Sequence, residues 1–223
     1  MIKHLWGAAL LTLSLGAQAQ LNFGQNLIVN GDAENGTTGW TVFDGYQNIQ
    51  SVSYGSNWVL PTEPGPSNRG LQMFAGLGAR AAAYQTLDLS GLGDLGSQTV
   101  QYDLTGWLGG WQSQGDNALL YVSFLDAFGN EIGHADIGPV TAADRGNKTG
   151  LQLRQNTGLL PTGTTSLMFS LSMERLVSSD NDGYADNLSF VLTTTPVPEA
   201  STLAYALMGI GLLSAAARRR RAG

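Results

Sequence analysis

Tryptophan and amide side chains gather in the middle of the chain, and these residue types suit the binding of a sugar. Trp107 and Trp111 enclose a Leu-Gly-Gly turn and are followed by Gln112 and Gln114, while Trp58 stands in a segment rich in Ser, Asn and Pro. An exposed ring can stack on the apolar face of a pyranose while amides bind its hydroxyls. These five residues form the predicted sugar-binding set, although Trp107 and Trp111 could also lie at the edge of the core.

Residues for catalysis are scarce. The sequence has no Gly-x-Ser-x-Gly elbow, no His-Glu-x-x-His pattern and no cysteine, and His134 is its one histidine after residue 19. A hairpin strand is the predicted location of that histidine, which makes a structural role the expected one. Two carboxylates suffice for a glycosidase, so a glycan-active hydrolase stays as an alternative. We expect no enzyme activity.

Composition limits the partners. The chain of 223 residues has 17 acidic and 11 basic residues, and residues 20–196 hold 16 of the acidic but only 6 of the basic ones. Nucleic acid and anionic lipid surfaces are therefore poor partners for this part. The absence of cysteine excludes disulfides and, with a single histidine, a classical zinc site, whereas oxygen ligands for calcium are plentiful.

The elements that must position these residues are β-strands. Short runs rich in β-branched and aromatic residues alternate with turns containing Gly, Asn and Asp, and no segment between the two ends of the chain keeps a helical period over three turns. We predict strands at 27–29, 70–74, 82–87, 99–108, 118–125, 131–135, 150–154, 166–173 and 187–192. Many short strands separated by turns predict an all-β sandwich or barrel spanning residues 20–192.

Three segments narrow this prediction. Residues 26–40 (NLIVNGDAENGTTGW), 109–133 (GGWQSQGDNALLYVSFLDAFGNEIG) and 183–192 (GYADNLSFVL) resemble the galactose-binding-like jelly rolls found among carbohydrate-binding modules. The resemblance implies a jelly-roll β-sandwich whose first and last strands lie side by side. It also implies that Trp40 lies in the core.

A structural calcium ion is a further implication of the resemblance. In such modules acidic residues at the end of the first strand meet an Asp that leads into the last strand. Carried onto this sequence, the candidate ligands are Asp32, Glu34 and Asp186. One calcium ion would offset the repulsion between three neighbouring carboxylates. The alternative is that the three are ordinary turn residues that bind the backbone.

The N-terminal end has the pattern of a signal peptide at residues 1–19. Lys3 precedes an apolar run at 5–15, and Ala17-Gln18-Ala19 has the small-x-small pattern that a signal peptidase cuts. We therefore expect cleavage after Ala19 and export of the chain across the inner membrane.

The C-terminal end has the pattern of a membrane anchor. A polar linker and motif at 193–199 lead to 18 apolar residues at 200–217, long enough for a transmembrane helix, and then to a basic tail at 218–223. Basic residues at the end of such a helix stay on the cytoplasmic side. The four basic residues are Arg218, Arg219, Arg220 and Arg221.

This C-terminal pattern resembles the PEP-CTERM sorting tail of Gram-negative bacteria. Val197-Pro198-Glu199-Ala200 stands where the family has Pro-Glu-Pro, with Ala200 in place of the second Pro. The resemblance implies processing by an exosortase-type enzyme and a final place at the cell surface or in the extracellular matrix. The two ends and the middle together predict an exported, non-catalytic carbohydrate-binding protein that attaches to or assembles extracellular polysaccharide, as in a biofilm. A structural matrix or surface-layer component without a sugar site is the alternative.

Overall fold

The computed structural model describes residues 21–196 except Ser56, Asp94 and Ser178. The predicted signal peptide, the Val197–Ala200 motif, the membrane segment 200–217 and the basic tail lie outside these residues. Within the described part, no helix has the length and apolar character to cross a membrane.

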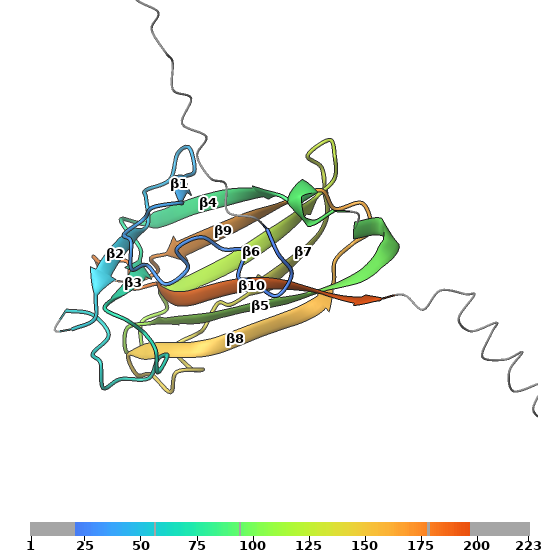
Figure 1. The fold of residues 1–223 in the computed structure, drawn as a ribbon. Helices are drawn as coiled ribbons and strands as arrows, with labels where there is room; N and C mark the ends of the chain where they lie inside the picture. The colour runs from blue at the N-terminus through green and yellow to red at the C-terminus, as the bar shows by residue number, and fades with distance from the viewer. Residues whose placement is uncertain (1–20, 56, 94, 178, 197–223) are drawn as a thin grey trace, which may run out of the picture.

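Two five-stranded antiparallel sheets face each other and form the domain (Figure 1). One sheet has the order β1-β4-β9-β6-β7 and the other β2-β3-β10-β5-β8. The short strands and turns predict an all-β sandwich or barrel, and the structure confirms the sandwich. Consecutive strands often lie in opposite sheets, as in a jelly roll. The strands are β1 (Thr41–Val42), β2 (Gln50–Ser53), β3 (Gln72–Ala75), β4 (Arg80–Asp88), β5 (Gln98–Gly110), β6 (Asn117–Leu125), β7 (Glu131–Ile137), β8 (Gly150–Leu159), β9 (Ser166–Glu174) and β10 (Tyr184–Pro196).

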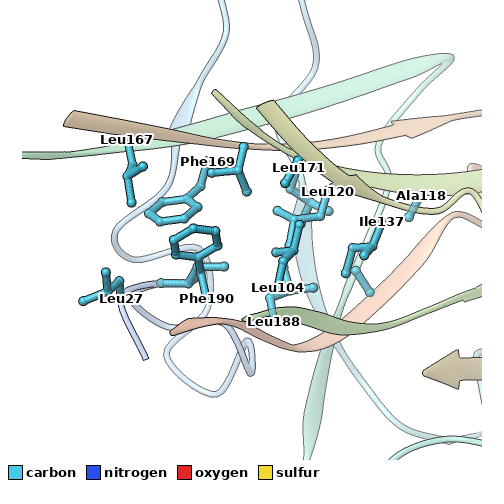
Figure 2. Close-up of a cluster of buried hydrophobic side chains, with 14 of the residues drawn as sticks. Leu27, Leu104, Ala118, Leu120, Ile137, Leu167, Phe169, Leu171, Leu188 and Phe190 are labelled. Carbon is cyan, nitrogen blue, oxygen red and sulfur yellow. The ribbon is translucent and has the colours of Figure 1, made fainter. Parts of the chain in front are cut away.

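Apolar side chains from both sheets fill the space between them. In β9 every second residue from Leu167 to Met173 is buried, which is the period-2 pattern of a strand with one covered face. Phe169 of β9 and Phe190 of β10 meet at the centre with ring centroids 5.4 Å apart and planes at 63° (Figure 2). We call this set the interior core. It includes Trp40, as the resemblance implies.

The first described residues run beside β10. The Leu27 N–H donates to the Phe190 carbonyl at 2.8 Å, and the Leu188 N–H donates to the Gly31 carbonyl at 2.9 Å. The terminal segments therefore lie side by side as implied, but residues 27–29 form no strand. A single bridge between Asn26 and Val191 takes its place, because the Ile28 N–H donates to Oδ1 of Asn26 and the Val29 N–H donates to Oε1 of Gln85 instead of to β10.

Strand β10 extends farther than predicted. The sequence predicts a polar tether at residues 193–196, but Thr193 pairs with Gln101 and the ladder continues to Pro196, which pairs with Gln98. Three consecutive β-branched threonines favour an extended, paired backbone, and β5 offers them a neighbour of matching length. The ordered domain therefore reaches the residue directly before the sorting motif.

Candidate functional site

A second apolar cluster covers the outer face of the β2-β3-β10-β5-β8 sheet. Side chains alternate across a strand, so residues next to interior ones point outward: Trp107 lies beside Leu108 of the interior core, and Tyr184 beside Ala185. We call this set the outer cluster. Its buried members are Val52, Val59, Met73, Ala75, Leu151 and Tyr184, and its half-buried members are Tyr54, Trp58, Trp107 and Trp111.

The outer cluster brings together the three tryptophans of the predicted sugar-binding set. Trp58 reaches it from the loop after β2 and meets the buried Tyr184 ring edge-on, with centroids 6.0 Å apart. Trp107 comes from β5, and Trp111 follows directly after that strand. Segments about 50 residues apart in the sequence therefore supply one aromatic surface.

The indole N–H groups of this surface are available to a ligand. No described residue accepts a hydrogen bond from Nε1 of Trp58, Trp107 or Trp111, whereas Nε1 of the core residue Trp40 donates to the Asn30 carbonyl at 3.3 Å. A partly buried indole N–H usually has a partner. A hydroxyl oxygen of a bound sugar could serve as one.

The two glutamines of the predicted set lie in the turn after Trp111. Gln112 is exposed, with a φ of 42°, and its N–H donates to Oγ1 of Thr149 at 3.1 Å. Arg145 is buried, and its Nη2 donates to the carbonyls of both Gln112 and Gln114, at 3.2 Å each. Sequence reasoning missed this role of Arg145, because nothing in the sequence links residue 145 to the turn at 112–114.

A pocket of about 450 Å³ opens beside Trp107. Trp107 and its cross-strand neighbour Leu153, which is half exposed, supply its apolar wall. Most of the other side chains that line it carry amides or hydroxyls. The lining residues are Asn26, Ile28, Asn30, Gly31, Asp32, Asn68, Thr105, Trp107, Leu153, Asn187, Leu188 and Ser189. The pocket therefore combines an aromatic ring with hydroxyl and amide groups and the carboxylate of Asp32, and the side-chain amides of Asn26 and Asn30 are bonded to backbone groups.

An irregularity in β10 shapes this pocket. The pairing with β5 shifts register between Asp186 and Ser189, and Asn187 has a φ of 47°. Asparagine tolerates this left-handed conformation better than most residues, and bulges often re-aim side chains beside functional sites. The Asn187 side-chain amide donates to Oδ1 of Asn68 at 3.1 Å, which joins β10 to the loop before β3.

The predicted calcium ligands lie near one another but are occupied by protein donors. Asp186 is fully buried, and its carboxylate accepts hydrogen bonds from the Tyr54 hydroxyl at 2.5 Å and from the Asn187 N–H at 2.7 Å. Oε1 of Glu34 accepts the N–H groups of Leu71 and Gln72, at 2.7 and 2.8 Å.

The electrostatics of Asp186 reflect its burial and its neighbours. The pKa of Asp186 is raised to about 7, chiefly by burial and to a smaller extent by the charges of Asp32 and Glu34, while hydrogen bonds from the Tyr54 hydroxyl and the Asn187 N–H act to lower it. Among the described residues, no group of three or more His, Cys, Asp or Glu side chains could hold a metal ion. The calcium ion stays a prediction, which a rise in melting temperature on adding calcium would support.

The tail matches a known family description. Residues 196–221 match the PEP-CTERM protein-sorting motif, which confirms the resemblance drawn from Val197–Ala200 and the basic cluster. None of the curated proteins matches the chain.

The sandwich is similar to several solved structures. One is the enzymatically active domain of tailspike protein 4 of Bacteriophage CBA120, at a TM-score of 0.49 and 14% identity over 75% of this chain and 21% of that chain. Another is Family 16 Carbohydrate Binding Module-2, at 0.47 and 24% identity over 74% and 99%. A third is the CBM22-1 xylan-binding domain of Paenibacillus barcinonensis Xyn10C, at 0.44 and 14% identity over 78% and 99%. The chain thus carries a PEP-CTERM sorting motif after a sandwich similar in fold to carbohydrate-binding modules.

Proposed function

We propose that the domain binds a polysaccharide without cleaving it, through Trp107 and the pocket beside it. The observation that carries the proposal is the position of Trp107 at the wall of a pocket lined by neutral amides and hydroxyls, half-buried and with no acceptor for its N–H among the described residues. Such a surface supplies stacking and hydrogen bonds together. Asp32 is the one charged side chain among the described residues that line this pocket.

We further propose that the protein displays this surface outside the cell. The sorting motif at 196–221 supports export and processing by an exosortase-type enzyme, and the expected signal peptide supports the same route. Attachment to extracellular polysaccharide, or its assembly, is then the role that fits a non-catalytic sugar-binding domain. The structural alternative, a matrix component without a sugar site, predicts no saturable binding.

A glycan array tests the proposal. Residues 20–196 contain both sheets and the entire interior core, so this part can be produced without the terminal segments. We expect saturable binding to at least one polysaccharide, with no release of reducing ends. Trp107→Ala should weaken that binding at least about tenfold, which corresponds to about 1.4 kcal/mol.

Phe128→Ala is the matched control. Phe128 is an aromatic residue at 89% exposure in the hairpin between β6 and β7, outside the outer cluster. Its removal should leave binding unchanged. Equal affinities of wild type and Trp107→Ala would refute the site, and absence of any saturable binding would favour the matrix alternative.

A further inference from the structure

The first described residues and the last part of strand β10 lie side by side. Strand β10 stays paired until Pro196, whose partner is Gln98 at the start of β5. The Gly24 N–H donates to the Leu192 carbonyl at 2.9 Å, so the segment that follows the expected signal peptide lies beside the same part of β10. We call this part of the sandwich the tail end; in Figure 1 the chain leaves β10 there, on the side of the two short 3-10 helices η1 (Ser90–Leu92) and η2 (Leu95–Ser97).

The link between the tail end and the predicted membrane segment is very short. Only residues 197–199 separate the last paired residue, Pro196, from the apolar segment that begins at Ala200. Four residue steps span at most about 14 Å when fully extended. The headgroup layer on one side of a bilayer takes up about 5 to 8 Å of that length. Before processing, the tail end must therefore lie within about 10 Å of the membrane surface.

A pocket opens at this end. It has a volume of about 610 Å³, and Gln98 and Thr99, which pair with the last two residues of β10, line it. Its apolar wall includes Leu95, Val100 and Leu159, the last of them 60% exposed. Most other lining residues are Gly, Ser and Thr.

Charged side chains are few among the described residues that line the tail-end pocket. Asp88 is the one charged residue in that described lining, and Asp94 stands in the sequence between the lining residues Gly93 and Leu95. The same described lining contains no lysine or arginine, so attraction to anionic lipids does not explain a contact.

We infer that the tail end is a membrane-facing surface, held by the short link against the phospholipid bilayer so that its pocket opens toward the lipid headgroups. The outer cluster then lies on the side of the sandwich away from the membrane, because β5 runs nine residues from Gln98 at the tail end to Trp107. At about 3.3 Å per residue this separation is about 30 Å. This orientation depends on the sorting tail and not on the glycan site.

Single-site labelling of the full chain tests this orientation. The sequence contains no cysteine, so Thr162→Cys at the tail-end pocket and Ser113→Cys in the turn after Trp111 each give one labelled position, and both residues are exposed. The protein is placed in phosphatidylcholine nanodiscs, with a fluorophore on the cysteine and a spin-label quencher on the lipid headgroups. We expect at least threefold stronger quenching at position 162 than at position 113. Equal quenching at the two positions would overturn the inference.

A longer link tests whether the link holds the surface in place. Inserting 20 Gly and Ser residues between Pro196 and Val197 raises the reach of the tether several-fold. Quenching at position 162 should then fall toward that at position 113. If the strong contrast persists with the long link, the claim that the short link positions this end is wrong.

Discussion

The interior core and the outer cluster are both apolar, but they differ in what covers them. The interior core lies between two sheets, and its central rings, such as Phe169, Phe190 and Phe124, are completely buried. The outer cluster lies outside one sheet, and Trp58, Trp107 and Trp111 keep part of their surface in water. Complete burial serves stability, whereas half-buried indoles are the groups that a ligand can cover. The degree of burial therefore separates residues that hold the fold from the residues that we propose for binding.

The largest effect should come from the interior core. Phe169→Ala removes a fully buried ring that contacts Phe190, and we expect the free energy of unfolding to fall by about 3 to 5 kcal/mol. Urea denaturation followed by circular dichroism measures this loss. A loss below about 1 kcal/mol would mean that the centre of the sandwich repacks freely, and the distinction between the two clusters would fail.

A buried carboxylate near the outer cluster should have the next largest effect. Asp116 is fully buried and accepts the N–H groups of Leu176, Val177 and Asp182, at 2.6, 2.8 and 3.1 Å, so it fixes the segment that leads into Tyr184. Asp116→Ala leaves these donors unsatisfied and should lower the free energy of unfolding by about 2 to 4 kcal/mol in the same urea experiment.

The control for that variant is Asp126→Ala. Asp126 also accepts backbone N–H groups, from Phe128 and Asn130, but in an exposed hairpin turn. Water can satisfy those donors, so the loss of stability should be clearly smaller than for Asp116→Ala. Equal losses of stability in Asp116→Ala and Asp126→Ala would show that burial of the carboxylate is unimportant.

The smallest effect should come from the wall of the pocket. Leu153 is half exposed beside Trp107, and Leu153→Ala should change the free energy of unfolding by less than about 1 kcal/mol. Its loss should nonetheless weaken polysaccharide binding about threefold, measured by isothermal titration calorimetry. A stability loss comparable to that of Phe169→Ala would place Leu153 with the core instead.

Local sequence patterns were sufficient to predict most of the β-strands. Runs of strand-forming residues at 118–125 and 166–173 predict strands, and the structure has β6 and β9 there. Such patterns do not reveal which segment covers the opposite face of a sheet. The hydrogen bonds of Arg145, Asn68 and Asn187 could not be predicted for this reason. They join segments that are far apart in the sequence.

Two errors in the predicted elements have a physical cause. Residues 27–29 have strand-forming side chains but bridge β10 only briefly. Residues 193–196 have no apolar side chains to bury except a proline, which predicts a tether, although β5 supplies the hydrogen-bonding partner that keeps them extended. Pairing along a neighbouring strand is a tertiary interaction that overrides local composition.

Nuclear magnetic resonance of the indole N–H groups tests the central claim most directly. In nitrogen-15-labelled residues 20–196 each tryptophan gives a separate signal, and a bound oligosaccharide from the array is titrated in. We predict that the Trp107 signal shifts most, with Trp58 and Trp111 shifting less, while Trp40, hydrogen-bonded inside the core, stays in place. A saturable shift of other signals with Trp107 unchanged would contradict the proposed site.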